Sequence, residues 1–373
     1  MSPPPTKRPR PKRPSRGRTA CAPRRAAPLL AAPGREPYVL HSTRSGVPVT
    51  LASATVAVTL EALREAAEGL AGVAVRTPLL DAPFLARRLG HPVALKAEFL
   101  QPIGAFKIRG AMNAVRRLDP VARARGLVTS SSGNHGQAIA FAGRHFGVRA
   151  VVVMPESAPT VKVEGVRRLG GEVVFAGKTR SAEQMDRALQ LAADEGLVLI
   201  PPYDHPDVIA GQGTCALEIM DEMPEVTAVL APVSGGGLLA GTCVAVRGLK
   251  PGARVIAVEP SGAAKLSAAI AAGRPVRLPR VDTMADGLQT PSIGALTFPI
   301  IRELVSDVVQ VSEEEIGAAV RALHGEMGLT VEPSGAVTVA ALLAGRVSLD
   351  GPAAAIVSGG NVDPAVFERL VRG

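Results

Sequence analysis

The sequence predicts a doubly wound α/β fold with mostly parallel strands. Its 373 residues are enough for about two domains at roughly 150 residues each. With 47% apolar and 20% charged residues, it has the composition of a chain that folds around a buried core. From residue 56 onward, short β-branched runs alternate with stretches of helical spacing. This alternation is typical of parallel sheets covered by helices.

The first predicted helix begins behind Thr59, a residue type that caps helix N-termini, and has Glu61 in its first turn. Its apolar side chains recur at helical spacing: Leu60, Leu63, Ala67 and Leu70. The middle of the chain predicts strands over 127–129, 148–154, 172–175 and 197–200. It predicts helices over 108–118, 160–169 and 181–194, and one more that follows the segment 130–137 and ends at about Phe146.

The last third predicts strands over 226–233, 255–258 and 353–357, each followed by a helical segment. Ser312 with Glu315 forms a capping box that opens a helix ending at Met327. The uncharged run over 227–246 contains Pro232 and three successive glycines, so a strand, a tight turn and a helix explain it better than a membrane span.

The net charge of +9 is concentrated at the N-terminus. Residues 1–55 hold eleven basic side chains and one acidic side chain, whereas the rest of the chain holds 31 basic and 32 acidic ones. We expect this Pro/Arg-rich extension to be disordered, because it lacks apolar surface to offset its ordering entropy. The near-neutral body and an aromatic content of 3% argue against a nucleic-acid binder acting through the extension.

Three hypotheses remain for this extension: a tether for nucleic acid or an anionic surface, a targeting segment, and a mis-assigned translation start. We favour the last, with a natural start at Val56 or Val58, and an intact mass that includes Met1 would contradict it. Three scattered cysteines, Cys21, Cys215 and Cys243, predict neither a disulfide framework nor a zinc site. We therefore expect a cytoplasmic protein without a membrane partner.

Four polar segments follow predicted strands or turns, where ligands of such sheets bind. In the first, Lys107 follows the turn residue Gly104 and stands at the start of a helix. Burial beside a positive helix end would lower the pKa of its amine and make it nucleophilic toward an aldehyde. A surface lysine is the alternative.

The second segment runs from Ser130 to Gln137 between a strand and a helix. Hydroxyl and N–H groups at a helix N-terminus can bind a carboxylate, so we expect this segment to bind substrate through Ser131, Gly133 and His135. The alternative is a serine that caps the helix.

The third segment, Ser234-Gly235-Gly236-Gly237-Leu238, follows a strongly apolar strand and opens a helix. Its N–H groups can converge on one phosphate, whereas it lacks the spacing of dinucleotide or nucleotide-hydrolase loops. The fourth places Ser358 after the last strand, where its hydroxyl can meet a ring nitrogen or simply cap. A nucleophilic lysine, a phosphate cradle, an anion site and a neutral polar group together indicate pyridoxal 5′-phosphate.

The chain resembles the fold-type II pyridoxal-phosphate enzymes, in the branch of threonine/serine dehydratases and serine racemases. The resemblance covers about residues 58–373 and rests on motifs in the family's order: Lys96-Ala97-Glu98-Phe99-Leu100-Gln101, Gly-Ala-Phe-Lys, Ser-Ser-Gly-Asn-His-Gly, the glycine loop, Val258-Glu259-Pro260 and Ser-Gly-Gly-Asn. It implies two domains, each an open, mostly parallel sheet flanked by helices: a large cofactor-binding domain over 56–125 and 204–373, and a small domain over 126–203.

The resemblance also implies roles for single residues. Lys107 is the Schiff-base lysine that removes the α-proton, and Ser132 is the hydroxyl on the opposite face of the cofactor. The remaining cofactor contacts that it implies are Phe106 on the ring, Asn134 on the 3′ oxygen, Ser234 to Leu238 on the phosphate, and Ser358 on the pyridine nitrogen. It further suggests a homodimer.

A serine cannot keep the pyridine nitrogen protonated, which favours loss of a β-hydroxyl group. We therefore expect α,β-elimination of L-threonine to 2-oxobutanoate and ammonia, and of L-serine to pyruvate and ammonia. Serine racemisation and dehydration of 3-hydroxyaspartate stay open as alternatives.

The sequence departs from the family pattern at three positions. Ala105 stands where serine is usual, and Ser234 replaces a glycine, which is tolerable if its φ is negative. Metal-binding members follow the counterpart of Glu259 with an acidic residue where this chain has Lys265. We expect a metal-independent enzyme in which this ammonium pairs with Glu259; a solvated lysine is the alternative.

Overall fold

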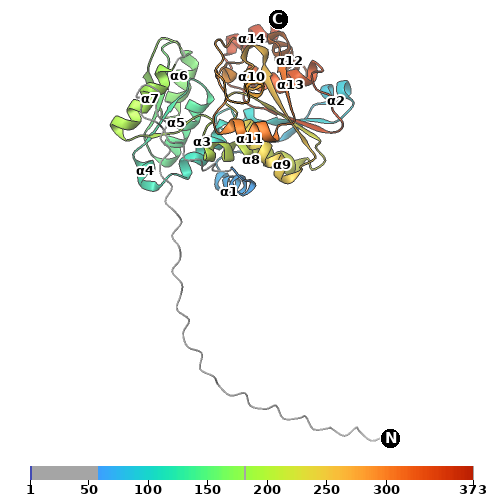
Figure 1. Cartoon of the computed structure of the whole chain (residues 1–373), viewed down its shortest axis with the longest axis horizontal. Helices are drawn as coiled ribbons and strands as arrows, with labels where there is room; N and C mark the ends of the chain where they lie inside the picture. Colours follow the sequence, from blue (N-terminus) through green and yellow to red (C-terminus); the bar gives the residue numbers. More distant parts are fainter. Residues whose placement is uncertain (2–57, 180–181, 373) are drawn as a thin grey trace. The chain divides into compact units, whose positions relative to one another are not determined.

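The computed structural model describes Met1 and residues 58–179 and 182–372 (Figure 1). The predicted disordered extension over 1–55 lies outside these residues apart from Met1. The residues from 58 onward belong to one compact unit, which is built around two β-sheets.

The larger sheet has six strands: β1 (Leu79–Asp81), β2 (Val93–Ala97), β7 (Ala228–Pro232), β8 (Arg254–Pro260), β9 (Asp307–Val311) and β10 (Ala353–Val357). Their order is β1-β2-β10-β7-β8-β9, and every neighbouring pair is parallel except β1 with β2. The smaller sheet has the order β5-β4-β3-β6 and is entirely parallel. Its strands are β3 (Leu127–Ser130), β4 (Ala150–Met154), β5 (Glu172–Phe175) and β6 (Val198–Leu199).

Fourteen α-helices are described in residues 58–179 and 182–372: α1 (Leu60–Leu70), α2 (Pro83–Leu89), α3 (Lys107–Arg116), α4 (Pro120–Ala124), α5 (Asn134–Phe146), α6 (Thr160–Arg168), α7 (Glu183–Glu195), α8 (Pro206–Glu222), α9 (Gly237–Leu249), α10 (Lys265–Ala272), α11 (Thr297–Leu304), α12 (Glu313–Met327), α13 (Pro333–Leu343) and α14 (Pro364–Arg372). Three short 3₁₀ turns accompany them: η1 (Glu98–Leu100), η2 (Ser261–Ala263) and η3 (Asp286–Leu288).

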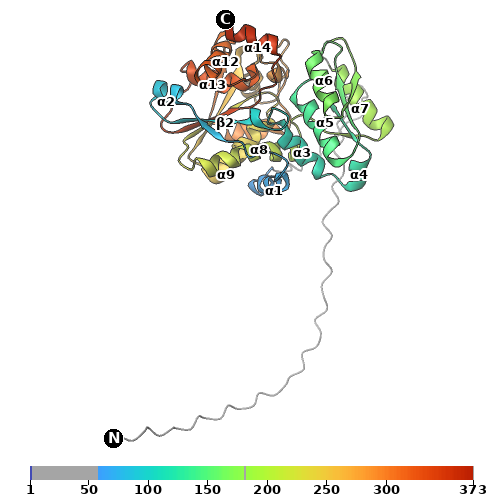
Figure 2. The same ribbon diagram turned by 180° about the vertical axis from the view of Figure 1, so that it is seen from behind.

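Both sheets are covered on both faces, and their apolar strands reflect this. In β4, Val151 and Val153 pack with residues of α7, whereas Val152 packs with residues of α5 and α6 on the other face. The larger sheet packs against α2, α12 and α13 on one face and against α8 to α11 on the other. Figure 2 shows α4 to α7 grouped apart from the helices of the larger sheet. Strands buried on both faces read as continuous apolar runs, which made β4, β7 and β10 predictable.

The predicted fold class is confirmed, and several elements begin or end as expected. Thr59 caps α1 by accepting a hydrogen bond from Ala62, and Ser312 with Glu315 forms the capping box of α12. The run over 227–246 divides into β7 and the larger part of α9. Among the described residues, no helix has both the length and the apolar character needed to cross a membrane.

Some predicted boundaries were wrong by a few residues. The strand predicted over 148–154 begins at Ala150, and the helix predicted over 181–194 begins at Glu183. The strands of the smaller sheet all lie within 126–203. This distribution supports our proposal of a small domain over 126–203 and a large domain over 56–125 and 204–373.

Candidate active site

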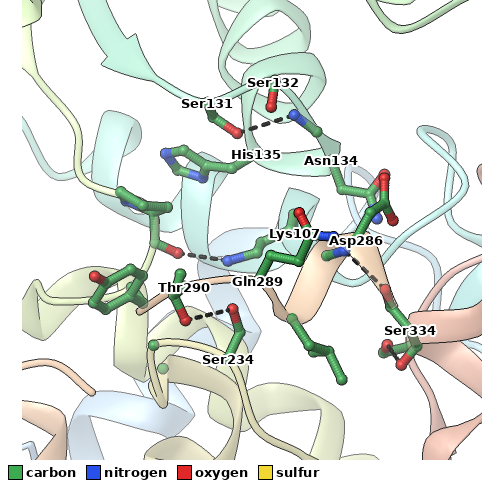
Figure 3. A pocket seen from close by; sticks show the side chains of 18 of the residues that line it. Lys107, Ser131, Ser132, Asn134, His135, Ser234, Asp286, Gln289, Thr290 and Ser334 are labelled. Carbon is green, nitrogen blue, oxygen red and sulfur yellow. Dashed lines mark hydrogen bonds between the residues drawn. The ribbon is translucent and has the colours of Figure 1, made fainter. Parts of the chain in front are cut away.

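One pocket is lined by segments that follow strands of both sheets (Figure 3). All of the predicted cofactor and substrate residues line it: Phe106, Lys107, Ser131, Ser132, Gly133, Asn134, His135, Ser234, Gly235, Gly236, Gly237, Leu238 and Ser358. The carboxyl ends of β3, β7 and β10 deliver three of these segments, as expected for ligand sites in parallel sheets.

Lys107 is the first residue of α3. Gly104 makes the preceding turn with a φ of +71°, and a side chain there would collide with Asn361, since a Cβ would lie 2.4 Å from its Oδ1. The Nζ atom of Lys107 donates a hydrogen bond to the carbonyl oxygen of Pro202 at 2.6 Å. Burial lowers the pKa of this amine to about 8. Lys107 is partly buried and lines the pocket, so it lies in the cavity that the sequence predicted rather than on the outer surface.

The serine loop, residues 130–133, connects β3 to α5. The N-cap of α5 is Gly133, which has no side chain to accept a hydrogen bond from the first turn, so the predicted serine N-cap is wrong. Ser131 Oγ accepts a hydrogen bond from the N–H group of Gly133 at 3.3 Å. Ser131 and Ser132 both lie at the pocket with the N-terminus of α5, which is an environment suited to an anion (Figure 3).

His135 is 2% exposed and lies in the first turn of α5. Its Nε2 atom is 3.0 Å from the carbonyl oxygen of Ile200. Burial and the nearby charge of Lys107 lower the pKa of the imidazole to about 3, so the ring is neutral. Because a carbonyl oxygen only accepts, Nε2 carries the proton and Nδ1 is a buried acceptor without a protein partner among the described residues.

The glycine loop, residues 234–238, connects β7 to α9. Gly236 has a φ of +98°, and a Cβ at Gly235 would lie 2.2–2.3 Å from ring atoms of Tyr203. Side chains at these positions are therefore excluded, which leaves N–H groups at the start of α9 open toward the pocket. All described residues with positive φ are glycines, so Ser234 meets the condition set for its replacement of glycine.

Asn134 is held from two sides. Its Nδ2 atom donates to Glu332 Oε1 at 2.8 Å, and its Oδ1 atom accepts from Asn361 Nδ2 at 2.8 Å. Burial raises the pKa of the Glu332 carboxyl to about 7, despite the opposing effects of Lys162 and Asn134. The amide of Asn134 is thus fixed in one orientation toward the pocket.

Ser358 follows β10 and is 3% exposed. Its hydroxyl donates to the carbonyl oxygen of Ser334 at 3.4 Å, a long and weak hydrogen bond. Its side chain therefore presents a neutral hydroxyl group at the pocket, where a carboxylate would carry charge.

Several pocket residues were missed by sequence reasoning. They are Lys162, Gln184, Tyr203, Asp286, Gln289, Thr290, Glu332 and Ser334. Lys162 of α6 and Asp286 of η3 form an ion pair, and Ser234 Oγ lies 3.0 Å from Thr290 Oγ1. These residues come from loops and helix starts without a motif. Glu332 alone left a signal, as an acidic residue directly before Pro333 at a helix start.

Glu259 and Lys265 lie close to this pocket but take other partners than predicted. The Glu259 carboxylate accepts hydrogen bonds from the N–H groups of Leu266 and Ser267, each at 2.9 Å. Lys265 is fully buried and donates to three backbone carbonyl groups, so the alternative of a solvated lysine is wrong. Glu259 therefore acts on Lys265 at a distance, by opposing the burial that lowers the pKa of its ammonium to about 8.

The pocket fits pyridoxal phosphate in three respects. It holds a buried amine with a lowered pKa, a loop where glycines keep side chains away from a helix N-terminus, and a neutral hydroxyl group after the neighbouring strand. These are the groups needed to meet an aldehyde, a phosphate and a pyridine nitrogen.

Comparisons with known proteins agree with the site. The family model described as "Pyridoxal-phosphate dependent enzyme" matches residues 70–359. The chain is 42% identical over 300 residues to an L-threo-3-hydroxyaspartate ammonia-lyase of Saccharomyces cerevisiae, covering 80% of this chain and 91% of the yeast protein. It is also 42% identical over 310 residues to an L-threonine ammonia-lyase of Geobacter sulfurreducens, covering 83% and 77%.

Among solved structures, maize serine racemase superposes with a TM-score of 0.81 at 36% identity, covering 83% of this chain and 96% of the maize chain. The resemblance inferred from the motifs is therefore confirmed over most of the sequence. On the matched residues and the geometry of the pocket, the chain belongs to the family of pyridoxal-phosphate-dependent enzymes.

Proposed function

We propose that this enzyme releases ammonia from a small β-hydroxy amino acid: water is first eliminated across Cα and Cβ, and hydrolysis of the resulting imine takes up one water and gives the 2-oxo acid and ammonia. L-Threonine would give 2-oxobutanoate and ammonia, and L-serine would give pyruvate and ammonia. The observation that carries the proposal is that one pocket holds both the amine of Lys107, whose pKa is lowered, and the neutral hydroxyl group of Ser358. The similarity to an L-threonine ammonia-lyase supports the same reaction.

The cofactor supplies an aldehyde and an electron-withdrawing ring when bound. We assign the contacts to its ring and ring substituents to Phe106, Asn134 and Ser358. The glycine loop, Ser234 to Leu238, would bind the phosphate through N–H groups at the start of α9. Asn134 is suited to its role because Glu332 and Asn361 already fix its amide.

Lys107 Nζ would take the α-proton of the substrate, because its lowered pKa leaves part of the amine neutral near pH 7. The substrate carboxylate would lie against the serine loop and the start of α5, bound by Ser131 and Gly133. His135 would contribute its buried Nδ1 acceptor, which is suited to a donor such as a bound water or an ammonium group.

Racemisation is the second candidate function. Ser132 lies in the same pocket as Lys107, and a hydroxyl on the other face of the substrate could return a proton there. The similarity to maize serine racemase favours this candidate. The two reactions share α-proton removal and differ in the fate of the β-hydroxyl group.

A substrate panel tests both candidates. L-Threonine, L-serine and L-threo-3-hydroxyaspartate are incubated with the purified enzyme, and 2-oxo acid, ammonia and the chirality of residual serine are measured. We expect 2-oxo acid from threonine or serine, and none from the Lys107→Ala variant. Serine that becomes racemic without 2-oxo acid would contradict elimination and support racemisation, whereas release from 3-hydroxyaspartate alone would move the substrate to a dicarboxylic amino acid.

We further propose a homodimer in the cytoplasm, with a small amino acid as its only required partner besides the cofactor. Family analogy supports both points. Sedimentation of the purified protein tests the first, since a monomer at micromolar concentration would contradict it.

A further inference from the structure

Lys265 occupies an unusual position for a lysine. Its side chain is 0% exposed, and Nζ donates to the carbonyl oxygens of Val233, Ala263 and Leu288 at 3.2, 2.8 and 3.0 Å. An ammonium group has three donors, so each of them is used. Several backbone carbonyl groups turned toward one positive charge are an arrangement otherwise typical of hard metal ions.

Two of the three carbonyl groups belong to segments that shape the active site. Val233 directly precedes the glycine loop, and Leu288 belongs to residues 286–290, which we call the pocket-wall segment. These residues line the pocket, and Figure 3 shows Thr290 beside Ser234 of the glycine loop. The two segments also meet through the hydroxyl groups of Ser234 and Thr290, 3.0 Å apart. Lys265 therefore links the residue that precedes the glycine loop to the pocket-wall segment through its hydrogen bonds.

Glu259 fixes the backbone next to Lys265 rather than its ammonium group. Its carboxylate oxygens accept from the N–H groups of Leu266 and Ser267, and from the Ser267 hydroxyl at 2.7 Å. This holds the start of α10, where Lys265 is the first residue. A metal ion that used Glu259 together with these carbonyl groups would have to displace the ammonium, so the residues present do not fit the metal site of metal-binding family members.

We propose that Lys265 is a positioning residue that replaces a bound metal ion: its ammonium group holds the glycine loop against the pocket-wall segment and so sets the affinity for the cofactor. The inference rests on the proposed phosphate role of the glycine loop. It does not depend on which amino acid is the substrate.

The first experiment measures cofactor affinity of the wild-type protein by fluorescence titration of the apoenzyme with pyridoxal phosphate. We expect the same dissociation constant in chelator and in millimolar Mg²⁺ or Ca²⁺. Affinity that falls in chelator and returns with either ion would overturn the proposal.

The second experiment removes the ammonium group. Lys265→Met leaves three buried carbonyl groups without a donor, so we expect cofactor binding weaker by roughly tenfold or more. Ammonium chloride should restore much of this loss, and tetramethylammonium chloride at equal ionic strength should not, because it has no N–H donor. The matched control is Lys250→Met. Lys250 follows the C-terminus of α9, the end remote from the glycine loop, and donates a hydrogen bond to the carbonyl oxygen of Pro224. Its replacement should leave the affinity for the cofactor unchanged.

A third variant covers the case in which Lys265→Met does not fold. Lys265→Asp places a second carboxylate near Glu259 and the carbonyl groups, so Mg²⁺ or Ca²⁺ should raise the melting temperature of its apo form, with no such rise in the wild type. Wild-type affinity in Lys265→Met, or no response to either ion in Lys265→Asp, would overturn the proposal. These readouts do not use turnover, so an error in the proposed substrate would leave them unchanged.

Discussion

At the scale of single residues, burial sets the chemistry of the pocket. It lowers the pKa of Lys107 to about 8 and raises that of Glu332 to about 7. The two shifts have opposite directions and one cause, because a pocket with little water disfavours whichever form is charged. Both groups therefore titrate within about one pH unit of neutrality, whereas their ordinary pKa values of 10.5 and 4.5 lie far from it.

The first prediction concerns uptake of the cofactor by the apoenzyme. Only the neutral amine of Lys107 attacks an aldehyde, so the rate should rise with pH and level off above a midpoint near 8, instead of near 10.5. Stopped-flow absorbance after mixing with pyridoxal phosphate measures it. The control is an analogue of pyridoxal phosphate that keeps the phosphate but lacks the aldehyde, and its binding should not depend on pH in this way. A midpoint above 10 would refute the lowered pKa.

The second prediction concerns the stability of Glu332→Gln. A carboxyl whose pKa is raised from 4.5 to about 7 destabilises the folded state increasingly as pH rises from 4.5 to 7, and the cost is complete above 7. Gln keeps an oxygen acceptor for Asn134 without the buried charge. At pH 8 the variant should exceed the wild type in free energy of unfolding, by on the order of 3 kcal/mol, and at pH 4.5 the two should be nearly equal.

Urea unfolding of the apo forms at both pH values measures this difference. An advantage of Gln that is equally large at pH 4.5 would show that it does not come from the titration of Glu332.

At the scale of elements, the sequence predicted most of the apolar strands and missed β1, β2 and β9. β4 and β10 are continuous apolar runs and were found, the latter with both ends correct. β2 is fully buried but contains Lys96, β9 has only Val311 buried and contains polar residues at two positions, and β1 has three residues. Such short or half-exposed strands owe their pairing to the neighbouring strand rather than to their own pattern.

At the candidate active site, the outcome depended on the kind of segment. Segments with chemically unusual composition were found, because glycines and serines directly after a strand carry a signal in a single sequence. Lys162, Asp286 and Thr290 were missed, because they reach the pocket through the packing of segments that are distant in the sequence. Lys265 was noticed, but its partners were not, since backbone carbonyl groups belong to every residue and leave no pattern.

The third prediction concerns the glycine loop as an element. In Gly235→Ala the new methyl group would overlap the ring of Tyr203, so loop or ring must move. We expect a loss of stability of roughly 1–3 kcal/mol and weaker binding of the cofactor phosphate. Gly252→Ala is the matched control, because no atom lies within 4 Å of the added Cβ. Adding Tyr203→Ala to Gly235→Ala should recover part of the affinity; unchanged affinity in Gly235→Ala itself would argue against a phosphate at this loop.

At the scale of the whole molecule, both sheets contribute to one pocket, and its lining residues lie between Phe106 and Ser358. All of these lining residues follow the basic extension in the sequence. The fold class and the family were predictable from the alternation of elements and from the motif order, since both are properties of long stretches of sequence.

The fourth prediction follows from this distribution. A variant that lacks residues 2–55 should bind pyridoxal phosphate with the affinity of the full chain and unfold at the same urea concentration. Fluorescence titration and circular dichroism measure the two quantities. A loss of affinity of tenfold or more on truncation would show that the extension takes part in forming the site.

The place of β10 in the larger sheet has a consequence for biosynthesis. This strand lies between β2 and β7 although it is the last strand to leave the ribosome. Until it emerges, β2 and β7 have no common neighbour. The edge of β2 stays unpaired while about 250 residues are translated, and the edge of β7 while about 120 are translated. Nascent chains should therefore acquire the vitamin-derived group only after β10 has left the ribosome, and products stalled or terminated before β10 should depend on chaperones.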